Sequence, residues 1–341
     1  MSESSDQLNA PLPNSLRSHD ATLPLLPPRD PAGHKGTFGT VGIFGGSAST
    51  HKPMIGAPAF AALAALRSGA GLARIAAPEP ILTSILSLCP SATGLAVPTH
   101  PDGTIEPHLA AQALDDLRAQ STALVVGPGL GTGPSSQAAV LKAVQDDSLP
   151  LILDADGLNS LAQVPDFWLD FRAPTILTPH PGEFRTLANA LDLAPHSHDP
   201  TNVTTRPVAC AALAQRLGAI VVLKGQHTVV SDGITTWTCR RGHPCLGTAG
   251  TGDILAGLLG GLVAQFYRPV PPALAAAMAR AGRPNPQLTL FNLACIAVEC
   301  HAIAGEWWAH RTNAEAGLLA QDLATLLPAV IQSQRAASTQ A

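Results

Sequence analysis

Two kinds of segment alternate along this chain, and their alternation limits the fold more than any other feature. From Gly36 onward, short runs rich in β-branched residues and bounded by Gly or Pro are followed by Ala- and Leu-rich stretches of helical length. This order is typical of βα units, because a parallel strand pair needs a long crossover that a helix supplies. The sequence therefore predicts an α/β fold with a mainly parallel central sheet.

The predicted strands lie at residues 40–44, 72–76, 123–126, 151–153, 175–177 and 219–223, with a hairpin that pairs 227–230 and 234–238. The predicted helices lie at residues 57–68, 136–145, 183–190, 208–217, 252–265, 288–309 and 316–327. Two Pro-rich segments, 192–207 and 268–287, interrupt the order and are expected to be surface loops.

One large domain is expected, since the chain has 341 residues of which 46% are hydrophobic, and no internal repeat or second compositional region is visible. Residues 1–33 hold six Pro among Ser, Asn and Asp, so we expect a disordered or loosely attached arm whose removal leaves function intact. The domain is expected over residues 34–330, followed by a flexible tail over 331–341.

Charge and cysteine usage limit the partners and the compartment. Charged residues make up 13% and the net charge is −4, so no broad basic surface is available for nucleic acid. The six cysteines form no CxxC pair and are expected to be reduced thiols. The N-terminus has no signal-peptide pattern and no stretch reads as a membrane span, so we expect a cytoplasmic protein without a membrane partner.

The strongest chemical motif is the glycine-rich run 247–253, which directly precedes an apolar stretch of helical length. Gly250, Thr251 and Gly252 allow successive backbone N–H groups to converge on an anion, and the positive end of the helix dipole favours the same charge. Asp253 enters the first turn, where its carboxylate can act as a base. The structural alternative is a tight turn with Asp253 as a helix cap.

A second glycine-rich loop, 127–131, follows the predicted strand 123–126. Ligands of open α/β sheets bind beyond the carboxyl ends of the strands, and small residues there allow close approach to the backbone. The loop does not match the dinucleotide fingerprint of the Rossmann fold, because Pro128 removes an N–H and no GxGxxG spacing follows. Taken alone it is equally compatible with a plain turn.

Polar side chains follow the next two predicted strands. Asp154 and Asp156 are candidates to hold a hydrated Mg²⁺ or to bind a ribose or pyridine group, and His180 is a candidate donor to a substrate phosphate or carboxamide. The structural alternative is that Asp156 caps one helix and that Pro181 with Glu183 begins another.

A basic residue stands at the end of the strand 219–223, in the run Lys224, Gly225, Gln226, His227 and Thr228. A lysine beside a glycine at a strand end can reach nucleotide phosphates, while the alternative is an exposed hairpin lysine.

A loop and a histidine complete the candidate functional positions. The loop that contains His51 and Lys52 is expected to contact substrate. His301, on an apolar predicted helix, is interpreted as a packed or helix-surface histidine.

Taken in order, these motifs resemble the ADP- or ATP-dependent NAD(P)H-hydrate dehydratases, over about residues 35–327. The residues that carry the resemblance are Lys35-Gly36-Thr37-Phe38-Gly39, Gly45-Gly46-Ser47, Gly56-Ala57-Pro58, Arg67-Ser68-Gly69-Ala70-Gly71-Leu72, the runs 127–131, 154–159, 178–183 and 224–228, and Gly250-Thr251-Gly252-Asp253. The resemblance implies a ribokinase-like three-layer α/β/α fold and an enzyme that uses ADP or ATP with Mg²⁺ to convert the (S) form of hydrated NADH or NADPH (NADHX or NADPHX) back to NADH or NADPH.

The resemblance also implies roles for residues. Asp253 looks like the base, with Gly250, Thr251 and Gly252 as the anion hole. The residues that look like the nucleotide site are Lys224, Gly225, Gln226, His227, Thr228 and Gly252. The residues that look like contacts of the hydrate are Ala57, Gly129, His180 and Asp253.

This chain departs from the family pattern before the anion hole. The family usually has Gly-Asn-Pro-Gly where Gly242-His243-Pro244-Cys245 stands here, so a contact made by that Asn side chain is in doubt. Many bacterial relatives carry an N-terminal epimerase, and with only about 35 residues before the match we expect the epimerase to be a separate protein. Relatives are often dimers or tetramers, so a homo-oligomer is expected.

Two other functions remain open. A small-molecule kinase of the same fold, acting on a vitamin-precursor alcohol, would use the same anion hole and would release a phosphorylated product. A nucleotide sensor without catalysis is disfavoured, because a carboxylate beside bound phosphates would cost affinity. The sequence does not decide between ADP and ATP or between NADHX and NADPHX.

Overall fold

The computed structural model describes residues 12, 13, 16, 20, 22–49, 52–193, 199–269 and 288–336. Within them nine strands form one sheet in the order β3-β2-β1-β4-β5-β6-β7-β8-β9. Strands β1 to β7 are parallel, while β8 and β9 are antiparallel. The strands are β1 (Thr40–Phe44), β2 (Leu72–Pro78), β3 (Thr93–Val97), β4 (Ala123–Val126), β5 (Leu151–Leu153), β6 (Thr175–Leu177), β7 (Ile220–Leu223), β8 (Val229–Ser231) and β9 (Thr236–Thr238).

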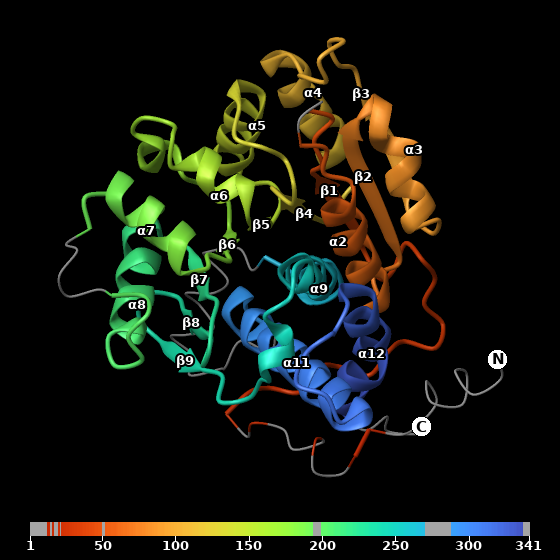
Figure 1. Ribbon diagram of the computed structural model, residues 1–341, viewed down its shortest axis with the longest axis vertical. Helices are drawn as coiled ribbons and strands as arrows, with labels where there is room; N and C mark the ends of the chain where they lie inside the picture. Colours follow the sequence, from red (N-terminus) through yellow and green to blue (C-terminus); the bar gives the residue numbers. More distant parts are fainter. Residues whose placement is uncertain are drawn as a thin grey trace.

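Helices cover both faces of the sheet (Figure 1). One face carries α2 (Gly56–Arg67), α3 (Glu79–Leu88), α9 (Thr251–Phe266), α11 (Leu290–Thr312) and α12 (Ala320–Ser333). The other carries α4 (Pro107–Arg118), α5 (Pro134–Gln145), α6 (Asp156–Leu161), α7 (Pro181–Ala190) and α8 (Arg206–Leu217). Short 3₁₀ turns occur at η2 (Phe167–Asp170) and η3 (Pro244–Leu246).

The strands divide their side chains between two cores, because successive residues of a strand point to opposite faces. In β4, Ala123 and Val125 pack with α2 and α9, whereas Leu124 and Val126 pack with the helices of the other face. Strands buried on both sides read as continuous apolar runs, which is why β4, β5 and β6 have the predicted bounds. The predicted three-layer α/β/α fold is confirmed.

Four elements are absent from the predicted strands and α-helices: β3, α3, α4 and α6, of which α6 was named only as a structural alternative. Strand β3 lies at the edge of the sheet and is mostly exposed, so it lacks the β-branched run that marks the buried strands. Helix α3 follows β2 without a break, and α4 lies in a polar stretch that was not assigned. The predicted loop 192–207 ends at 205, because α8 begins at Arg206; the loop at 268–287 lies largely outside the described residues.

The described part of the N-terminal segment packs against the domain, so the expectation of a loosely attached arm is wrong for it. Leu26 has no exposed surface, and its backbone pairs with that of Arg335 beyond the end of α12. Trp237 Nε1 donates to Asp20 Oδ2 over 2.9 Å. Helix α12 continues to Ser333, past the expected start of a flexible tail at 331, because its last turns are buried. The other domain boundaries remain predictions.

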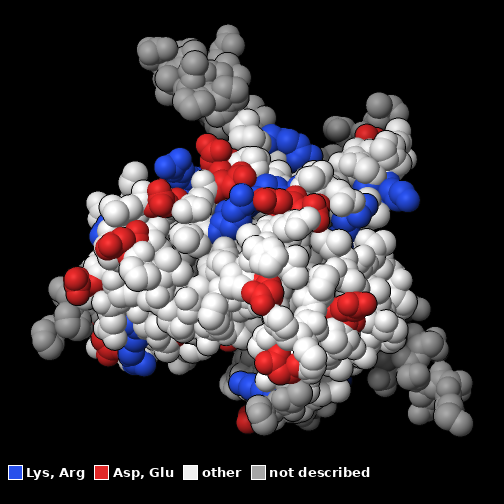
Figure 2. Space-filling model, turned by 90° about the horizontal axis from the view of Figure 1, so that it is seen from above, with Lys and Arg blue, Asp and Glu red and all other residues white. Residues whose placement is uncertain are grey.

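All six cysteines are buried and free of disulfides. None of the described helices is both long and apolar enough to cross a membrane. On the face shown in Figure 2, acidic and basic side chains are interspersed and much of the surface is uncharged.

Candidate active site

The candidate site lies where the parallel strands end. The loops after β4, β5, β6 and β7 reach the same edge of the sheet, and α9 begins there. Because parallel strands all present their carboxyl ends at one edge, motifs far apart in the sequence meet at this place.

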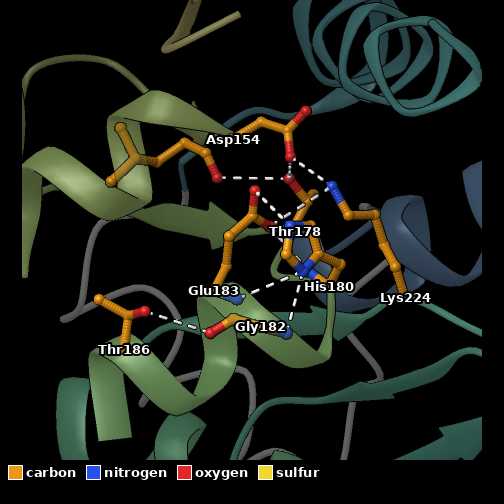
Figure 3. A network of polar contacts seen from close by, with 8 residues as sticks. Asp154, Thr178, His180, Gly182, Glu183, Thr186 and Lys224 are labelled. Atoms are coloured by element: carbon orange, nitrogen blue, oxygen red, sulfur yellow. Dashed lines mark hydrogen bonds and ion pairs between the residues drawn. The ribbon is translucent and has the colours of Figure 1, made fainter. Parts of the chain in front are cut away.

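An ion pair forms the centre of the site (Figure 3). Lys224 Nζ, after β7, donates to Asp154 Oδ1, after β5, over 2.7 Å. Thr178 Oγ1, after β6, donates to the same oxygen over 2.6 Å. The Asp154 side chain is 2% exposed and that of Lys224 19%. Burial lowers the pKa of Lys224, but the Asp154 and Glu183 carboxylates outweigh it and raise the pKa above its usual value. Lys224 is therefore a fixed positive charge, not an exposed hairpin lysine.

Helix α7 begins with a capping box that turns Glu183 into the site (Figure 3). His180 Nδ1 accepts from the N–H groups of Gly182 and Glu183, over 2.9 and 3.3 Å. Glu183 Oε2 accepts from the N–H of His180 over 2.8 Å and lies 3.8 Å from Lys224 Nζ. The structural alternative therefore holds, because His180 and Glu183 begin a helix, and Glu183 also borders the ion pair.

His180 is placed to donate a hydrogen bond. Burial and the charge of Lys224 lower its pKa, so the ring is neutral at pH 7. Because Nδ1 accepts two N–H groups, the single ring proton resides on Nε2. The side chain is 56% exposed, and its Nε2 lies 3.3 Å from Glu183 Oε1.

The loops after β4 and β5 are in direct contact. Gly127 has a φ of 121°, and a Cβ at this position would lie 1.9 Å from the carbonyl oxygen of Asp154. Asp156 Oδ2 accepts from Gly131 N over 2.9 Å, so Asp156 holds the glycine loop instead of capping α6. Between the two aspartates Ala155 has a φ of 52°, a conformation that non-glycine residues seldom adopt and that concentrates at functional sites.

Asp253 is the third residue of α9 and has no side-chain partner among the described residues. Burial raises its pKa to about 7, and the charges of Asp154 and Asp156 act in the same direction, against Lys224. Gly250, before it, has a φ of 89°, and a Cβ there would lie 2.9 Å from that of Ala320. The capping alternative for Asp253 is not observed, because the helix has no side-chain cap. An unpaired carboxylate that titrates near neutrality suits a general base.

The side chains of Thr251 and His301 form hydrogen bonds that fix the start of α9. Thr251 Oγ1 donates to the carbonyls of Leu246 and Thr248, both over 2.8 Å. His301 Nε2, on α11, lies 2.9 Å from the carbonyl oxygen of Thr251. Burial lowers the pKa of His301 to about 4, so the ring is neutral and Nε2 donates. The interpretation of His301 as a packed histidine is confirmed, and its hydrogen bond anchors the predicted anion hole.

The loop after β7 depends on a residue that sequence reasoning missed. Arg206, the first residue of α8, donates through Nη2 to the carbonyls of Leu223 and Lys224, each over 2.9 Å, and through Nη1 to that of Gln226. Its guanidinium also abuts Gly225. A lone arginine at a helix start, where acidic residues are favoured, was the only signal in the sequence.

Two of the four predicted contacts of the hydrate, Ala57 and Gly129, lie close together at the start of α2. A Cβ at Gly129 would lie 3.3 Å from Ala57 Cβ and 2.9 Å from Met54 Cβ. Met54 thus joins Ala57 and Gly129, although nothing in the sequence marked it. Lys224 lies beside the start of α9, because a Cβ at Gly252 would be 3.7 Å from Lys224 Nζ. Gln226, His227 and Thr228 lie in the partly exposed loop beyond Lys224.

The departure before the anion hole, 242–245, forms a turn. His243 Nδ1 accepts from the N–H of Cys245 over 3.3 Å, and Cys245 Sγ contacts the carbonyl of Gly305. Gly242 N donates to Glu306 Oε1 over 2.7 Å. The turn is therefore built from its own side chains and from α11. Of the loop expected to contact substrate, Lys52 is described and exposed, whereas His51 lies outside the described residues.

No three His, Cys, Asp or Glu side chains of the described residues are grouped to bind a metal directly. Asp154 Oδ1 is already occupied by Lys224 and Thr178. Mg²⁺ commonly keeps several waters and binds through one or two carboxylates together with phosphates. The acidic residues of the site fit an ion held in that way.

A family model described as NAD(P)H-hydrate dehydratase matches residues 41–329. The bifunctional NAD(P)H-hydrate repair enzyme Nnr of Salinibacter ruber is 42% identical over 73% of this chain and 44% of its own length. Nnr of Gloeobacter violaceus is 35% identical over 93% of this chain and 53% of its own length. The chain thus spans about half the length of these curated relatives.

Two solved structures are similar to this chain in fold. The ADP/ATP-dependent NAD(P)H-hydrate dehydratase of Bacillus subtilis, co-crystallised with ATP and Mg²⁺, is 28% identical with a TM-score of 0.67 and covers 93% of this chain and 100% of its own. A ribokinase-like superfamily protein of Enterococcus faecalis shares the fold, with a TM-score of 0.69 and 22% identity over 91% of this chain and 93% of its own.

Proposed function

This chain belongs to the NAD(P)H-hydrate dehydratase family, and we propose that it converts hydrated NADH and NADPH back to NADH and NADPH at the expense of ADP or ATP. The observation that carries the proposal is the Asp253 carboxylate. It is unpaired, has a pKa of about 7, and lies at the start of a helix between the glycine loop of β4 and the lysine loop of β7. This arrangement places a base between two binding regions.

The chemistry follows from the need for a good leaving group. Hydroxide leaves the hydrated ring poorly, so the ring hydroxyl is first phosphorylated. Asp253 takes the proton of this hydroxyl while the hydroxyl oxygen accepts the terminal phosphoryl group of the nucleotide. The lone pair of the ring nitrogen then expels phosphate as the C–O bond breaks. Loss of a proton from the neighbouring ring carbon restores the dihydronicotinamide. The products are the reduced dinucleotide, phosphate and the shortened nucleotide.

Each side of Asp253 has its own task in this proposal. Gly250, Thr251 and Gly252 stabilise the transferred phosphoryl group through backbone N–H groups, with the Lys224 ammonium beside them. The loop from Lys224 to Thr228 binds the nucleotide. The hydrate is contacted by Ala57, Gly129 and His180. Nε2 of His180 donates to a carboxamide or phosphate oxygen of the hydrate.

Mg²⁺ would be held on the nucleotide phosphates, with Asp154 and Asp156 reaching it through water. It would supply positive charge that offsets the charge developing on the phosphates. The B. subtilis relative was crystallised with ATP and Mg²⁺, which supports this assignment.

The test is to incubate the purified protein with chemically hydrated NADH, Mg²⁺ and either ADP or ATP, and to follow the absorbance of reduced nicotinamide. Recovery that requires one nucleotide supports the proposal and identifies the phosphoryl donor. A folded protein that binds nucleotide but restores no absorbance contradicts it. A stable phosphorylated product would instead identify a small-molecule kinase.

We further propose that the enzyme acts on the (S) epimer and works with a separate epimerase. A base and an anion hole fixed on α9 address one face of the ring, so one epimer is consumed. With a mixture of epimers, recovery should stop when that epimer is exhausted and resume when a purified epimerase is added.

A further inference from the structure

A cavity of about 500 Å³ lies at the same edge of the sheet as the candidate active site, and Asp253 is not among its lining residues. It is lined by the loops that follow β1, β3 and β4, by Pro78 at the end of β2, and by the starts of α4 and α5. Its volume falls within the range of small-molecule sites. None of the roles assigned so far uses this cavity.

The strand order places the cavity on the substrate side of the site. The nucleotide loop follows β7, the central ion pair follows β5, and the hydrate contact Gly129 follows β4. The cavity continues this row, since Leu130 and Gly131 line it directly after Gly129, and most of the other lining residues follow β1 and β3 or continue from Gly131 into α5. Neighbouring strands are about 4.8 Å apart, so the row extends roughly 10 Å beyond β4 as far as β2.

A dinucleotide needs such a continuation. With its ring between Asp253 and Gly129, the rest of the molecule has to leave on the side opposite the phosphoryl donor, because the donor occupies the β7 side. That exit leads to the cavity. Resting on the proposed function, we infer that this cavity binds the adenosine half of the hydrated dinucleotide and favours hydrated NADH over hydrated NADPH.

The lining suits an adenosine. Pro78, Ile105 and Leu130 offer apolar surface to a base, while Ser47 and Thr132 contribute hydroxyl groups. Glu106 is the carboxylate of the cavity, and carboxylates at nucleotide sites accept hydrogen bonds from ribose hydroxyls.

The negative charge of Glu106 would repel a 2′-phosphate. Glu106 Oε1 lies 2.5 Å from His100 Nε2, and no other hydrogen bond to its side chain occurs within the described ranges. Oε2 is thus open to a ribose hydroxyl. No Lys or Arg belongs to the described lining; Lys52 follows the lining residue Ser49 by three positions without being part of it. A phosphate with nearly two negative charges would meet a carboxylate and no fixed cation.

The experiment compares three hydrated substrates: NADH, NADPH and reduced nicotinamide mononucleotide, which has the reacting ring but no adenosine. We expect kcat/KM for hydrated NADH to exceed that for hydrated NADPH roughly tenfold, and the mononucleotide to have a KM about tenfold higher than hydrated NADH at similar kcat.

Variants locate the effect. Thr132→Trp fills the cavity and should raise KM for hydrated NADH without changing that for the mononucleotide, whereas Thr83→Trp, on the exposed face of α3, should change neither. Glu106→Gln keeps the size of the side chain and removes its charge, so the preference over hydrated NADPH should shrink.

Equal KM values for the mononucleotide and hydrated NADH would overturn the inference, as would an unchanged preference in Glu106→Gln. In both cases the dehydratase function would stand. If the folded protein converts none of the three hydrates, the proposed function itself fails.

Discussion

At the residue scale, two carboxyl groups of the site titrate near neutrality. Burial raises the pKa of both Asp253 and Glu183 to about 7. Their surroundings differ, because Glu183 accepts a backbone N–H and lies 3.8 Å from Lys224, whereas Asp253 is unpaired. Glu183 is therefore fixed in place, and Asp253 is the group free to take a proton from a ligand.

The role of Asp253 predicts a specific kinetic defect. Asp253→Asn keeps the shape of the side chain and removes the base, so kcat should fall about 10²- to 10⁴-fold while nucleotide binding persists. Steady-state kinetics with nucleotide titration would measure both quantities. Asp116→Asn, an exposed change on α4, is the matched control and should behave as wild type. Wild-type turnover in Asp253→Asn would remove Asp253 from catalysis.

A dependence on pH follows from the same group. The base works only when ionised, so kcat/KM should be constant above about pH 7 and fall as the pH drops below the pKa of Asp253, by about tenfold per pH unit. The rate falls toward low pH because protonated Asp253 cannot accept the proton of the hydroxyl. Rates measured between pH 5.5 and 9 would test this. A profile without an acidic limb near pH 7 would contradict the assignment.

At the element scale, Arg206 connects the start of α8 to the loop after β7. A buried guanidinium that donates to three carbonyl oxygens fixes the backbone of Leu223, Lys224 and Gln226. No carboxylate forms an ion pair with it in the part of the chain that the structure describes. Arg206 thus fixes the backbone of the proposed nucleotide loop through main-chain oxygen atoms.

This connection predicts an effect on the nucleotide. Arg206→Lys keeps the charge but lacks the planar fork, so KM for the nucleotide should rise about tenfold or more while kcat changes less. Arg216→Lys, near the exposed end of the same helix, is the matched control. If the Arg206 variant lowers thermal stability and leaves the nucleotide KM unchanged, the residue has only a structural role.

At the scale of the whole molecule, the N-terminal segment contacts the domain far from the site. Arg29 donates to the carbonyl of Gly69, past the end of α2, and its guanidinium lies 3.5 Å from the centre of the Phe38 ring. It also contacts Gln265, twelve residues after Asp253 on α9. At 1.5 Å per helical residue that is about 18 Å from Asp253. The segment is therefore expected to stabilise the fold without taking part in the chemistry.

Removal of residues 1–28 should lower stability and spare activity. Loss of the buried Leu23 and Leu26 removes about 1.5–3 kcal/mol each, offset in part by the freedom that the chain regains. Thermal unfolding should shift down by several degrees, while kcat at low temperature stays close to wild type. Leu26→Ala should reproduce part of the shift, and Leu25→Ala, with Leu25 46% exposed, should not. An unchanged melting temperature would contradict the packing argument.

The layered fold and the position of each motif could be predicted from the order of the residues. Buried parallel strands have to be apolar on both faces, so β4, β5 and β6 were visible as short runs with clear ends. The glycine-rich turns were visible too, because few other residues adopt the conformation that Gly250 has. The exposed edge strand β3 escaped prediction, because little of its sequence is dictated by burial.

Which side chains meet depends on the packing of elements that are distant in the sequence. Asp154 and Lys224 are 70 positions apart, and their contact depends on β5, β6 and β7 being neighbours in the sheet. The contact of His301 with Thr251 depends in the same way on how α11 packs against α9. Local preferences determine where a strand or helix begins and ends. Charge pairing and the pKa values of Asp253 and Glu183 arise from burial and distance, which exist only once the sheet and its two helical layers have assembled.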